Sequence, residues 1–272
     1  GTKGMHYVAE MKGIGYSINP KIQFVDISHM ITPFKILEAN YMLQTVYHTF
    51  PSPMIFVCVV DPGVGTDREI LAFRTKDNYY FVGPDNGIFS YFFTNHLIDK
   101  LVTVSNSQYY NSSYTKAINE NKEPETVTFH GRDIMAPVAA HLSTGVDLAK
   151  IGTIKQDFSD FVSLDIQSMV NLQISDQMGA LIQYIDSFGN IVTTIKISDF
   201  KLKHLEYDTK LYLEWESKKY EIFYSKTFGS SYSGKLLLIP GSSGYMEICQ
   251  NQHSAAQTLG MSVGSEFFLN FS

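Results

Sequence analysis

The apolar run "MIFVCVV" at residues 54–60 constrains the fold of this chain more than any other feature. A strand built from it has no polar face, so it must be covered on both sides, as strands are in the middle layer of an α/β domain. The polar stretch "DPGVGTDR" at 61–68 follows at once. Ligands of open α/β sheets bind beyond the carboxyl ends of such strands, so this stretch is a candidate site.

Strand-like and helix-like segments alternate through the first half of the chain. The chain opens with a loop and a helix within residues 1–13, whereas an α/β domain ordinarily opens with a strand. We therefore expect an N-terminal α/β domain, residues 1–165, with a largely parallel or mixed sheet flanked by helices and with its first strand missing from this chain. The pattern predicts strands at 21–28 and 54–60, helices at 36–50 and 133–145, and a hairpin-like pair at 69–75 and 78–83.

The second half of the chain has a different residue pattern. From about Asp165 it consists of short β-rich segments separated by Gly, Ser, Asn and Lys, with little helical periodicity. Short strands at close spacing are typical of a small barrel or sandwich. We therefore predict a C-terminal β-barrel-like domain, residues 166–272, that contributes to the substrate site. Its strands are expected at 177–186, 190–197, 210–215, 218–224, 235–240, 245–250 and 265–271.

The composition disfavours several classes of protein. Hydrophobic residues make up 44% of the chain and charged residues 18%, with a formal net charge of −6, which describes a soluble globular protein. Nucleic acid is disfavoured as a partner because phosphate neutralisation requires a basic surface. No stretch approaches the roughly 20 apolar residues of a membrane span, so we expect no membrane partner. Cys58 and Cys249 each lie in an apolar run, which favours free thiols in a cytoplasmic protein.

Two polar clusters in the first half carry the candidate chemistry. Arg68 can fold back across the Pro-Gly turn to meet Asp61, although an Asp before Pro-Gly also commonly bonds its own backbone. In "FHGRD", Asp133 is a candidate helix N-cap and Arg132 a candidate structural ion-pair partner. His130 precedes the helix, whose positive end disfavours imidazolium and keeps the ring able to accept a proton. The alternative for His130 is a partly buried structural histidine.

Three further motifs combine turn residues with polar groups. "GPDNG" is first of all a turn signature, although Asp85 or Asn86 can face a ligand if the turn lies on the same rim. In the β-rich half, "IDSFGNIVTTI" and "GSSGYMEICQNQHSAA" place small and polar residues beside strands. Asn190, Ser242 and Ser243 can hydrogen-bond an amino acid or a base edge. Tight-turn chemistry explains the same glycine-containing motifs equally well.

Metal binding and covalent catalysis are competing interpretations of these residues. Asp61, Asp85, His130 and Asp133 are possible metal ligands, but their spacing lacks compact patterns such as His-x-x-x-His. No Ser or Cys lies in a nucleophile-elbow sequence, so a covalent triad is poorly supported. We therefore expect neither a metal nor another cofactor.

Five motifs, in order along the chain, resemble one family. They are "VVDPGVGTDR", "VGPDNG", "TFHGRDIMAPVAA", "IDSFGNIVTTI" and "GSSGYMEICQNQHSAA", which span residues 59–256, and "MKG" and "VDISHMITPF" extend the likeness toward the N-terminus. The family is that of the S-adenosyl-L-methionine (SAM) hydroxide adenosyltransferases, or SAM hydrolases, which are related to the fluorinase and chlorinase enzymes. The resemblance implies an N-terminal α/β domain, a C-terminal β-barrel and a homotrimer. It also implies active sites between the N-terminal domain of one subunit and the C-terminal domain of the next.

The reaction implied by the resemblance is nucleophilic attack at the ribose C5′ of SAM with release of methionine. With water as the nucleophile, the other product is adenosine. The family's catalytic Asp, Arg and His fall on Asp61, Arg68 and His130. Alignment of one water with the C5′–S bond provides much of the rate. Asp61 or neutral His130 accepts a proton, and Arg68 holds the water or a developing hydroxide.

The halogenase relatives differ at the same positions. The fluorinase pattern has Tyr where Asp61 stands, and Tyr-Ser where His130 and Gly131 stand. A carboxylate at Asp61 would repel a halide, so a hydrolase is predicted and a halogenase is the less favoured alternative.

Further substrate contacts follow from the resemblance. Phe34 takes the place of an aromatic residue beside the ribose and sulfonium, and Ser243 stands where the fluorinase has an Arg. The other predicted substrate-binding residues are Asp186, Phe188, Asn190 and Ser242 around the methionine moiety, Asn251, Gln252 and Phe228 around the adenine, and Asp85 and Phe129.

One departure from the family concerns ribose binding. The family's first strand ends in an Asp just ahead of the Gly that matches Gly1, and that Asp, which holds both ribose hydroxyls, is not in this chain. His6 stands where relatives carry a smaller residue. Two other functions remain open at this point. One is a metal-dependent hydrolase that uses the Asp and His cluster, and the other is a non-catalytic SAM- or adenosine-binding protein.

Overall fold

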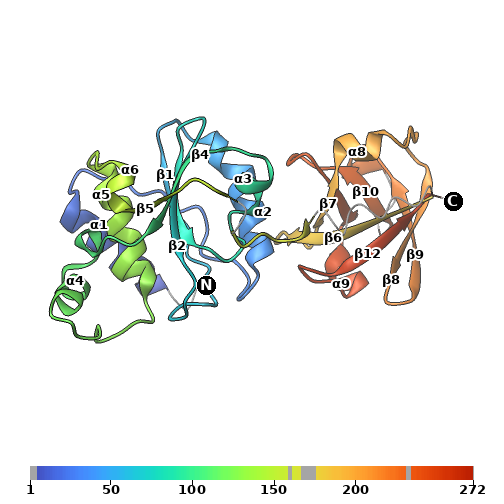
Figure 1. Ribbon diagram of the computed structural model, residues 1–272. Coiled ribbons are helices and arrows are strands. Elements are labelled where there is room, and N and C mark those ends of the chain that lie inside the picture. Colours follow the sequence, from blue (N-terminus) through green and yellow to red (C-terminus); the bar gives the residue numbers. More distant parts are fainter. Residues whose placement is uncertain (1–4, 159–160, 167–175, 231–233, 272) are drawn as a thin grey trace. The chain divides into compact units, whose positions relative to one another are not determined.

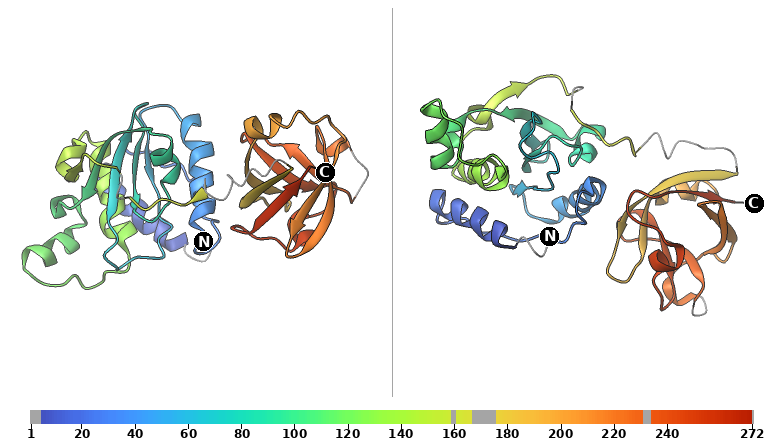
Figure 2. Two further views of the ribbon diagram at one scale, coloured as in Figure 1. Left: turned by 45° about the vertical axis from the view of Figure 1, so that its right-hand side comes forward. Right: turned by 90° about the horizontal axis from the view of Figure 1, so that it is seen from below.

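The computed structural model divides the chain into two compact units, Gly1–Leu164 and Asp165–Ser272 (Figure 1, Figure 2). Each unit has its own hydrophobic core. The residues that the structure describes are 5–158, 161–166, 176–230 and 234–271.

The first unit is built on a five-stranded mixed sheet. Its strands are β1 (Ile55–Val57), β2 (Ile70–Thr75), β3 (Tyr80–Pro84), β4 (Ile98–Val104) and β5 (Gly152–Lys155), in the spatial order β1-β3-β2-β4-β5. β1 runs parallel to β3, and the other neighbouring strands are antiparallel. The predicted hairpin-like pair is therefore confirmed as β2 and β3, and β1 lies at one edge of the sheet.

Helices cover both faces of this sheet. The helices of the unit are α1 (Met5–Ile18), α2 (Ile36–Val46), α3 (Ser90–Thr94), α4 (Ser112–Asn119), α5 (Ala136–Ser143) and α6 (Leu148–Ile151). α1, α5 and α6 lie on one face, and α2 and α3 on the other (Figure 1). This arrangement confirms the predicted α/β domain with a mixed sheet and flanking helices.

Burial on both faces follows from the side-chain alternation of the strands. Along β2, Leu71 and Phe73 pack into the core under α2 and α3, whereas Ile70 and Ala72 pack into the core under α5. Phe73 stacks on Phe81 of β3 with ring centroids 4.9 Å apart. Because both faces are covered, these strands carry apolar residues at successive positions.

Several predicted boundaries differ from the observed ones. The helix expected at 36–50 is α2 followed by a 3₁₀ turn, Tyr47–Thr49, which ends before Pro51. The strand expected at 54–60 is ladder-paired only over β1, although the Cys58 N–H still donates to the Val82 carbonyl at 2.9 Å. The helix expected at 133–145 begins earlier, with a π-helical turn at Gly131–Met135 that leads into α5.

The strand predicted at 21–28 is wrong. Residues 22–28 run as chain without regular secondary structure, and Val25 is 64% exposed. A strand exists only when a neighbouring strand satisfies its N–H and C=O groups, and this segment has no such neighbour among the described residues. β-branched composition alone therefore did not make it a strand.

The second unit is a closed β-barrel, as predicted. Its strands are β6 (Gln177–Ile185), β7 (Ile191–Lys196), β8 (Lys210–Trp215), β9 (Lys218–Tyr224), β10 (Leu236–Pro240), β11 (Tyr245–Gln250) and β12 (Glu266–Asn270). They close in the order β10-β11-β7-β6-β12-β8-β9. Two short helices, α8 (Ile197–Lys201) and α9 (Ala255–Leu259), pack on this barrel. Its interior is apolar, with Ile182, Leu213 and Ile248 fully buried.

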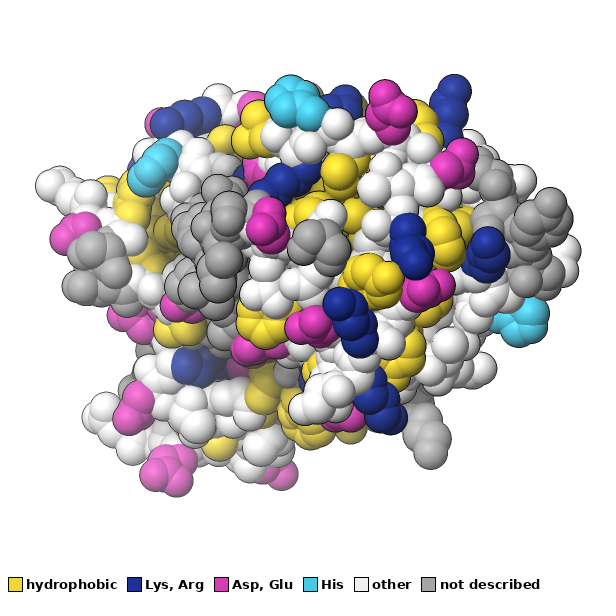
Figure 3. Space-filling view, turned by 90° about the vertical axis from the view of Figure 1, so that its right-hand side faces the viewer, with side chains coloured by type: hydrophobic (Ala, Val, Ile, Leu, Met, Phe, Trp, Pro, Cys, Tyr) yellow, Lys and Arg dark blue, Asp and Glu magenta, His cyan; other side chains and the backbone are white. Residues whose placement is uncertain are grey.

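Surface charge and helix length indicate which kinds of partner this protein can bind. On the face shown in Figure 3, Lys and Arg side chains are interspersed with Asp and Glu among the coloured residues. Over the described ranges, no helix has the length and apolarity that crossing a membrane requires.

Candidate active site

A buried ion pair lies just beyond the carboxyl end of β1. Arg68 folds back over the Asp61–Arg68 turn, as the sequence predicts, and its Nε donates to Oδ1 of Asp61 at 2.8 Å. Nη2 of Arg68 donates to Oδ2 of the same carboxylate, so the pair is bidentate. The two side chains are only 9% and 5% exposed. Gly63 lies beside the Arg68 stem, and a Cβ there would make an ordinary contact with Cγ of Arg68 at 3.4 Å.

His130 completes the cluster from a distant part of the chain. Its Nδ1 lies 2.8 Å from Nη2 of Arg68, and its side chain is buried beside Tyr114, whose ring meets it edge-on. Burial lowers the pKa of His130 below its ordinary value, and the adjacent Arg68 charge lowers it further, against the opposing influence of Asp61 and Asp133. The neutral ring was predicted from the helix end, but burial is the main cause.

The contact with Arg68 decides which tautomer His130 adopts. A guanidinium N–H can only donate, so Nδ1 of neutral His130 must be the acceptor and the ring proton must lie on Nε2. Nη1 of Arg68 is also buried and has no partner among the described residues. The cluster therefore offers two N–H donors, Nε2 and Nη1, next to one carboxylate.

The π-helical turn after His130 is held by a second ion pair. Asp133 was predicted to cap a helix, and this is wrong: its buried carboxylate accepts from Nε and Nη2 of Arg132 at 2.8 and 2.9 Å. It also accepts from Nδ2 of Asn111 at 3.2 Å. Arg132 is the structural ion-pair partner that the sequence predicts, and its Nη1 reaches Glu10 on α1 at 3.0 Å. Because the chain enters a π turn rather than a capped α-helix, Asp133 points into the protein.

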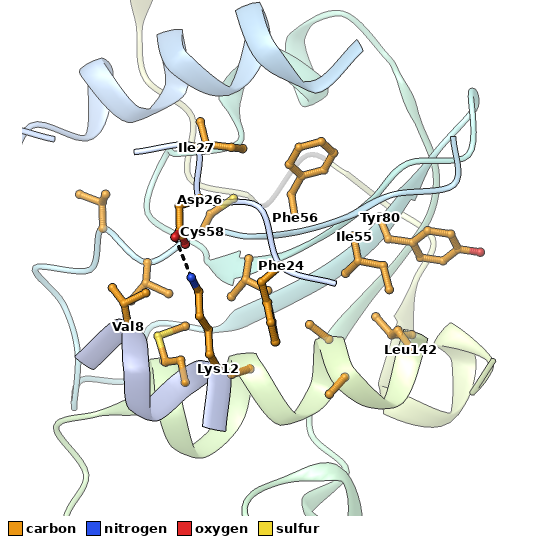
Figure 4. Close-up of a pocket in the computed structure, with 18 of the residues that line it drawn as sticks. Val8, Lys12, Phe24, Asp26, Ile27, Ile55, Phe56, Cys58, Tyr80 and Leu142 are labelled. Atoms are coloured by element: carbon orange, nitrogen blue, oxygen red, sulfur yellow. Dashed lines mark hydrogen bonds and ion pairs between the residues drawn. The ribbon is translucent and has the colours of Figure 1, made fainter. Parts of the chain in front are cut away.

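The cluster opens into a large cavity of about 1470 Å³. Asp61, Phe129 and His130 line it at the carboxyl end of β1. Side chains of α1, α5, β1 and segment 22–33 line much of the remainder, and the Lys12–Asp26 ion pair is among them (Figure 4). Phe129 packs between Tyr7, 5.0 Å away between ring centroids, and the Arg132 guanidinium, 4.9 Å above its ring. A water-sized nucleophile and a larger organic substrate can both reach the cluster.

Other predicted residues of this unit lie elsewhere. Phe34 is 77% exposed on the loop before α2, with a positive φ of 68°, and does not line the cavity. Asp85 accepts from the Val162 N–H at 3.1 Å, and its pKa is raised to about 6, mainly by burial. Its neighbour Asn86 donates to the Val60 carbonyl at 2.8 Å and so supports the loop that carries Asp61.

In the barrel unit, the predicted methionine-binding residues form a turn between β6 and β7. Oδ1 of Asp186 accepts from the N–H groups of Phe188 and Asn190, both at 2.9 Å, and Oδ2 accepts from the Asn190 amide at 2.9 Å. Phe188 is 78% exposed. Gly189 adopts φ +82° against Ser254, the N-cap of α9. The polar groups of Asp186 and Asn190 therefore hydrogen-bond within the turn, and the Phe188 side chain points outward.

The remaining predicted residues of the barrel are scattered along its loops. Ser242 is exposed in the turn between β10 and β11, whereas Oγ of Ser243 is buried without a partner among the described residues. The Asn251 carbonyl accepts from the Gly234 N–H at 3.1 Å, and Gln252 is exposed with φ +64°. Phe228 is 43% exposed.

Sequence reasoning missed Glu247 on β11. Its Oε1 lies so close to Gly241 that a Cβ there would be 2.1 Å away. Burial raises its pKa, and the charge of Asp186 raises it further. Two carboxylates therefore lie near each other beside the Ser242 turn. The alternation of "YMEICQ" contains the only hint, an acidic residue inside an otherwise apolar strand.

The metal alternative finds no preformed site in the part of the chain that the structure describes. No group of three or more His, Cys, Asp or Glu side chains is arranged there to hold a metal ion. Cys58 and Cys249 are both buried free thiols, and burial raises the pKa of each.

The fold and the cluster together define a class of protein: a mixed-sheet α/β unit with a buried Asp–Arg–His cluster at the end of an edge strand, followed by a closed β-barrel. Residues 1–152 match the family model of the SAM hydroxide adenosyltransferase N-terminal domain, and residues 180–268 match that of its C-terminal domain. The chain belongs to the SAM hydroxide adenosyltransferase family.

Curated relatives and solved structures agree with this assignment. A protein of Methanocaldococcus jannaschii named (R)-S-adenosyl-L-methionine hydrolase is 30% identical over 262 residues, which cover 94% of this chain and 87% of that protein. A fluorinase of Nocardia brasiliensis is 24% identical, with 94% and 90% covered. The crystal structure of an uncharacterized conserved protein from Thermotoga maritima is 30% identical, with a TM-score of 0.84 and coverage of 97% and 95%.

Proposed function

We propose that this protein hydrolyses SAM to adenosine and L-methionine by attack of water at the ribose C5′. Membership of the family and three curated relatives named (R)-S-adenosyl-L-methionine hydrolase, 28–30% identical over 94–95% of the chain, support the reaction. The structural observation that carries the proposal is the buried Asp61–Arg68–His130 cluster at the end of β1.

The main task of the protein in this reaction is to position the water and the substrate. The C5′–S bond breaks with its electron pair moving to sulfur, so the sulfonium becomes the neutral thioether of methionine. The new C5′–O bond forms from water, which must then lose one proton. Holding water in line with the breaking bond replaces a bimolecular encounter by a positioned one. No Lewis acid is required for this leaving group, so we propose that the reaction uses no metal or other cofactor.

We propose a separate task for each residue of the cluster. His130 holds the water by donating from Nε2–H, since its Nδ1 accepts from Arg68. The Asp61 carboxylate is the acceptor for the proton that the water loses. Arg68 fixes the other two side chains, and its Nη1, which has no partner in the part of the chain that the structure describes, is a donor for the developing hydroxide. Of the two possible bases, Asp61 is therefore favoured over His130.

The remaining contacts complete the proposed site. We propose that Phe34 lies beside the ribose and sulfonium and that Asp85 and Phe129 also contact the substrate. The methionine and adenine moieties contact Asp186, Phe188, Asn190, Phe228, Ser242, Ser243, Asn251 and Gln252. We further propose a homotrimer with sites at its subunit interfaces, and a cytoplasmic location. The buried free thiols of Cys58 and Cys249 support the location. Light scattering in solution tests the trimer.

The deciding experiment mixes the protein with SAM, EDTA and chloride and follows products by chromatography. Equal amounts of adenosine and methionine support the proposal, and their formation in EDTA supports metal independence. The halogenase alternative predicts 5′-chloro-5′-deoxyadenosine instead. Tight SAM or adenosine binding with no product would overturn the hydrolase in favour of a binding protein.

A further inference from the structure

Helix α4 is attached to the turn that carries His130. Asn111, the residue before α4, donates its backbone N–H to the carbonyl of Asp133 at 2.8 Å and its Nδ2 to Oδ1 of Asp133 at 3.2 Å. Asp133 belongs to the π-helical turn that follows His130 directly. α4 lies on the same side of the sheet as α1 and α5 (Figure 1). The start of α4 is therefore fixed beside the catalytic cluster.

Tyr114, in the first turn of α4, contacts the His130 ring. The two ring centroids are 6.4 Å apart and the ring planes are at 88°. This edge-to-face arrangement falls within the roughly 4.5–7 Å over which aromatic rings attract each other. The pKa of Tyr114 is raised, mainly by burial, so its hydroxyl stays protonated. The group that meets His130 is therefore a neutral aromatic ring.

A second tyrosine links Tyr114 to the sheet. The ring of Tyr110 meets that of Tyr114 at 6.0 Å and 68°, and its hydroxyl donates to the carbonyl of Val104, the last residue of β4, at 3.3 Å. Both tyrosines pack against the core under α5. The contact between Tyr114 and His130 is therefore supported by the sheet as well as by α4.

The hydrogen bond to Arg68 does not by itself fix the orientation of the His130 ring. It holds Nδ1 at 2.8 Å from Nη2 of Arg68, but the χ2 angle of a histidine is only weakly restricted. A ring that rotates about this contact moves Nε2, on its other side, away from the water. A catalytic group must be held to within about 0.5 Å and 10–20°. A ring packed edge-on against the imidazole limits this rotation.

Tyr114 reaches the cluster through His130 rather than through the cavity. In the part of the chain that the structure describes, His130 lines the cavity but no residue of α4 does. α4 also contains no fully buried residue among those described, so a substitution at Tyr114 leaves the main cores intact. Any effect of Tyr114 on the chemistry must therefore pass through the imidazole.

We propose that Tyr114 is a positioning residue whose ring holds the plane of the His130 imidazole and shields it from solvent, so that Nε2–H points at the attacking water. The ring carries this role, and the hydroxyl does not. The effect on catalysis rests on the proposed hydrolysis of SAM. The effect on the imidazole itself does not, and it can be measured without substrate.

The kinetic test compares two substitutions of Tyr114 with one matched control. Tyr114→Phe keeps the ring, and Tyr114→Leu removes it. The control is Tyr109→Leu, because Tyr109 meets His141 edge-on at 5.1 Å and 74° in the same unit, away from the cluster. We expect Tyr114→Leu to lower kcat by at least about tenfold with KM for SAM changed by less than about twofold. Tyr114→Phe should keep most of the wild-type kcat, and Tyr109→Leu all of it.

The second readout is an NMR titration of the His130 ring in the absence of SAM. Burial is the main cause that lowers the pKa of His130. Loss of the Tyr114 ring admits water, so the pKa of His130 should rise toward its ordinary value of 6.5 in Tyr114→Leu and stay unchanged in Tyr114→Phe. The charged groups around His130 are Arg68, Asp61 and Asp133, and all three are retained in these variants. The His141 titration serves as the internal reference.

Two outcomes overturn the proposal. One is wild-type kcat together with a wild-type His130 titration in Tyr114→Leu. The other is a Tyr114→Phe protein as slow as Tyr114→Leu, which would mean that the hydroxyl is required. If the wild type itself does not hydrolyse SAM, the proposed function fails, and the titration alone decides whether Tyr114 holds His130. If circular dichroism shows that Tyr114→Leu does not fold, Tyr114→Met replaces it under the same criteria.

Discussion

Nη2 of Arg68 lies 2.8 Å from Nδ1 of His130 and also donates to the carboxylate of Asp61. One nitrogen thus joins an anion and a neutral ring in a buried position. Because Arg cannot accept a hydrogen bond, this contact determines the tautomer of His130 and leaves Asp61 as the only anion of the cluster.

Replacement of Asp61 by Asn should abolish the proposed proton acceptor while keeping the side-chain shape. We expect kcat for SAM hydrolysis to fall by at least about 100-fold, the lower range for loss of a general base. The matched control is Asp67→Asn, which neutralises an exposed carboxylate in the same loop. Turnover of Asp61→Asn at the rate of the control would remove Asp61 from the mechanism.

The tautomer of His130 can be tested with two amides. The Gln amide nitrogen occupies the position of Nε2, whereas the Asn side chain reaches only as far as Nδ1. If His130 acts through Nε2–H, His130→Gln should retain at least about tenfold more kcat than His130→Asn. Circular dichroism checks that both variants fold. The reverse order of activities would mean that the contact at Nδ1 matters and the Nε2 donor does not.

Acid should lower the stability of the fold through His130. Its pKa is lowered by burial and by Arg68, so the unfolded chain binds this proton more readily than the folded one. The stability that this shift contributes is fully present above the ordinary His pKa of 6.5 and declines as the pH falls from 6.5 toward the lowered value. Urea unfolding at pH 7.5 and pH 5.5 measures this. His130→Gln should show a smaller decline than the wild type between the same two buffers.

Asp85 should have the opposite pH dependence. Burial raises its pKa to about 6, so the folded state favours the protonated carboxyl. This preference stabilises the fold at low pH and is lost as the pH rises from about 4 to about 6. Asp85→Asn should therefore be more stable than the wild type at pH 7, by up to about 3 kcal/mol, and nearly equal to it at pH 4. Denaturant unfolding at both pH values decides this, and equal stability at pH 7 would contradict it.

Ala substitutions at two glycines of the barrel distinguish the cost of a left-handed backbone from the cost of steric crowding. Gly189 and Gly244 have φ of +82° and +88°, but a Cβ at Gly189 would lie 2.0 Å from Oγ of Ser254, whereas nothing lies within 4 Å at Gly244. Both Ala variants pay about 1–2 kcal/mol for the left-handed backbone. Gly189→Ala should lose a further 1–3 kcal/mol, roughly, from crowding. Thermal unfolding compares the two, and equal losses would show that Ser254 moves aside freely.

The sequence predicted most of the layered domain but placed one strand wrongly. The apolar run at 54–60 and the alternating barrel strands are strong local signals, and both appear as strands. Residues 21–28 carry a similar signal without forming a strand, because pairing depends on a neighbour that sequence periodicity does not reveal. The Asp133 side chain was mistaken for a cap because a π turn cannot be distinguished from an α-helical start by residue type.

By itself, the sequence determined the two kinds of unit, the family motifs and the local turn that brings Arg68 to Asp61. These features depend on short-range spacing and on side-chain type, and both can be read directly from the amino-acid sequence. Only the tertiary structure decided that Nδ1 of His130, 62 positions from Arg68, contacts Nη2 of Arg68, that Glu247 lies near Asp186, and that β1 lies at one edge of the sheet of described strands. Such relationships arise when distant segments pack together, and their geometry is set by burial and by backbone pairing rather than by the residues of any one segment.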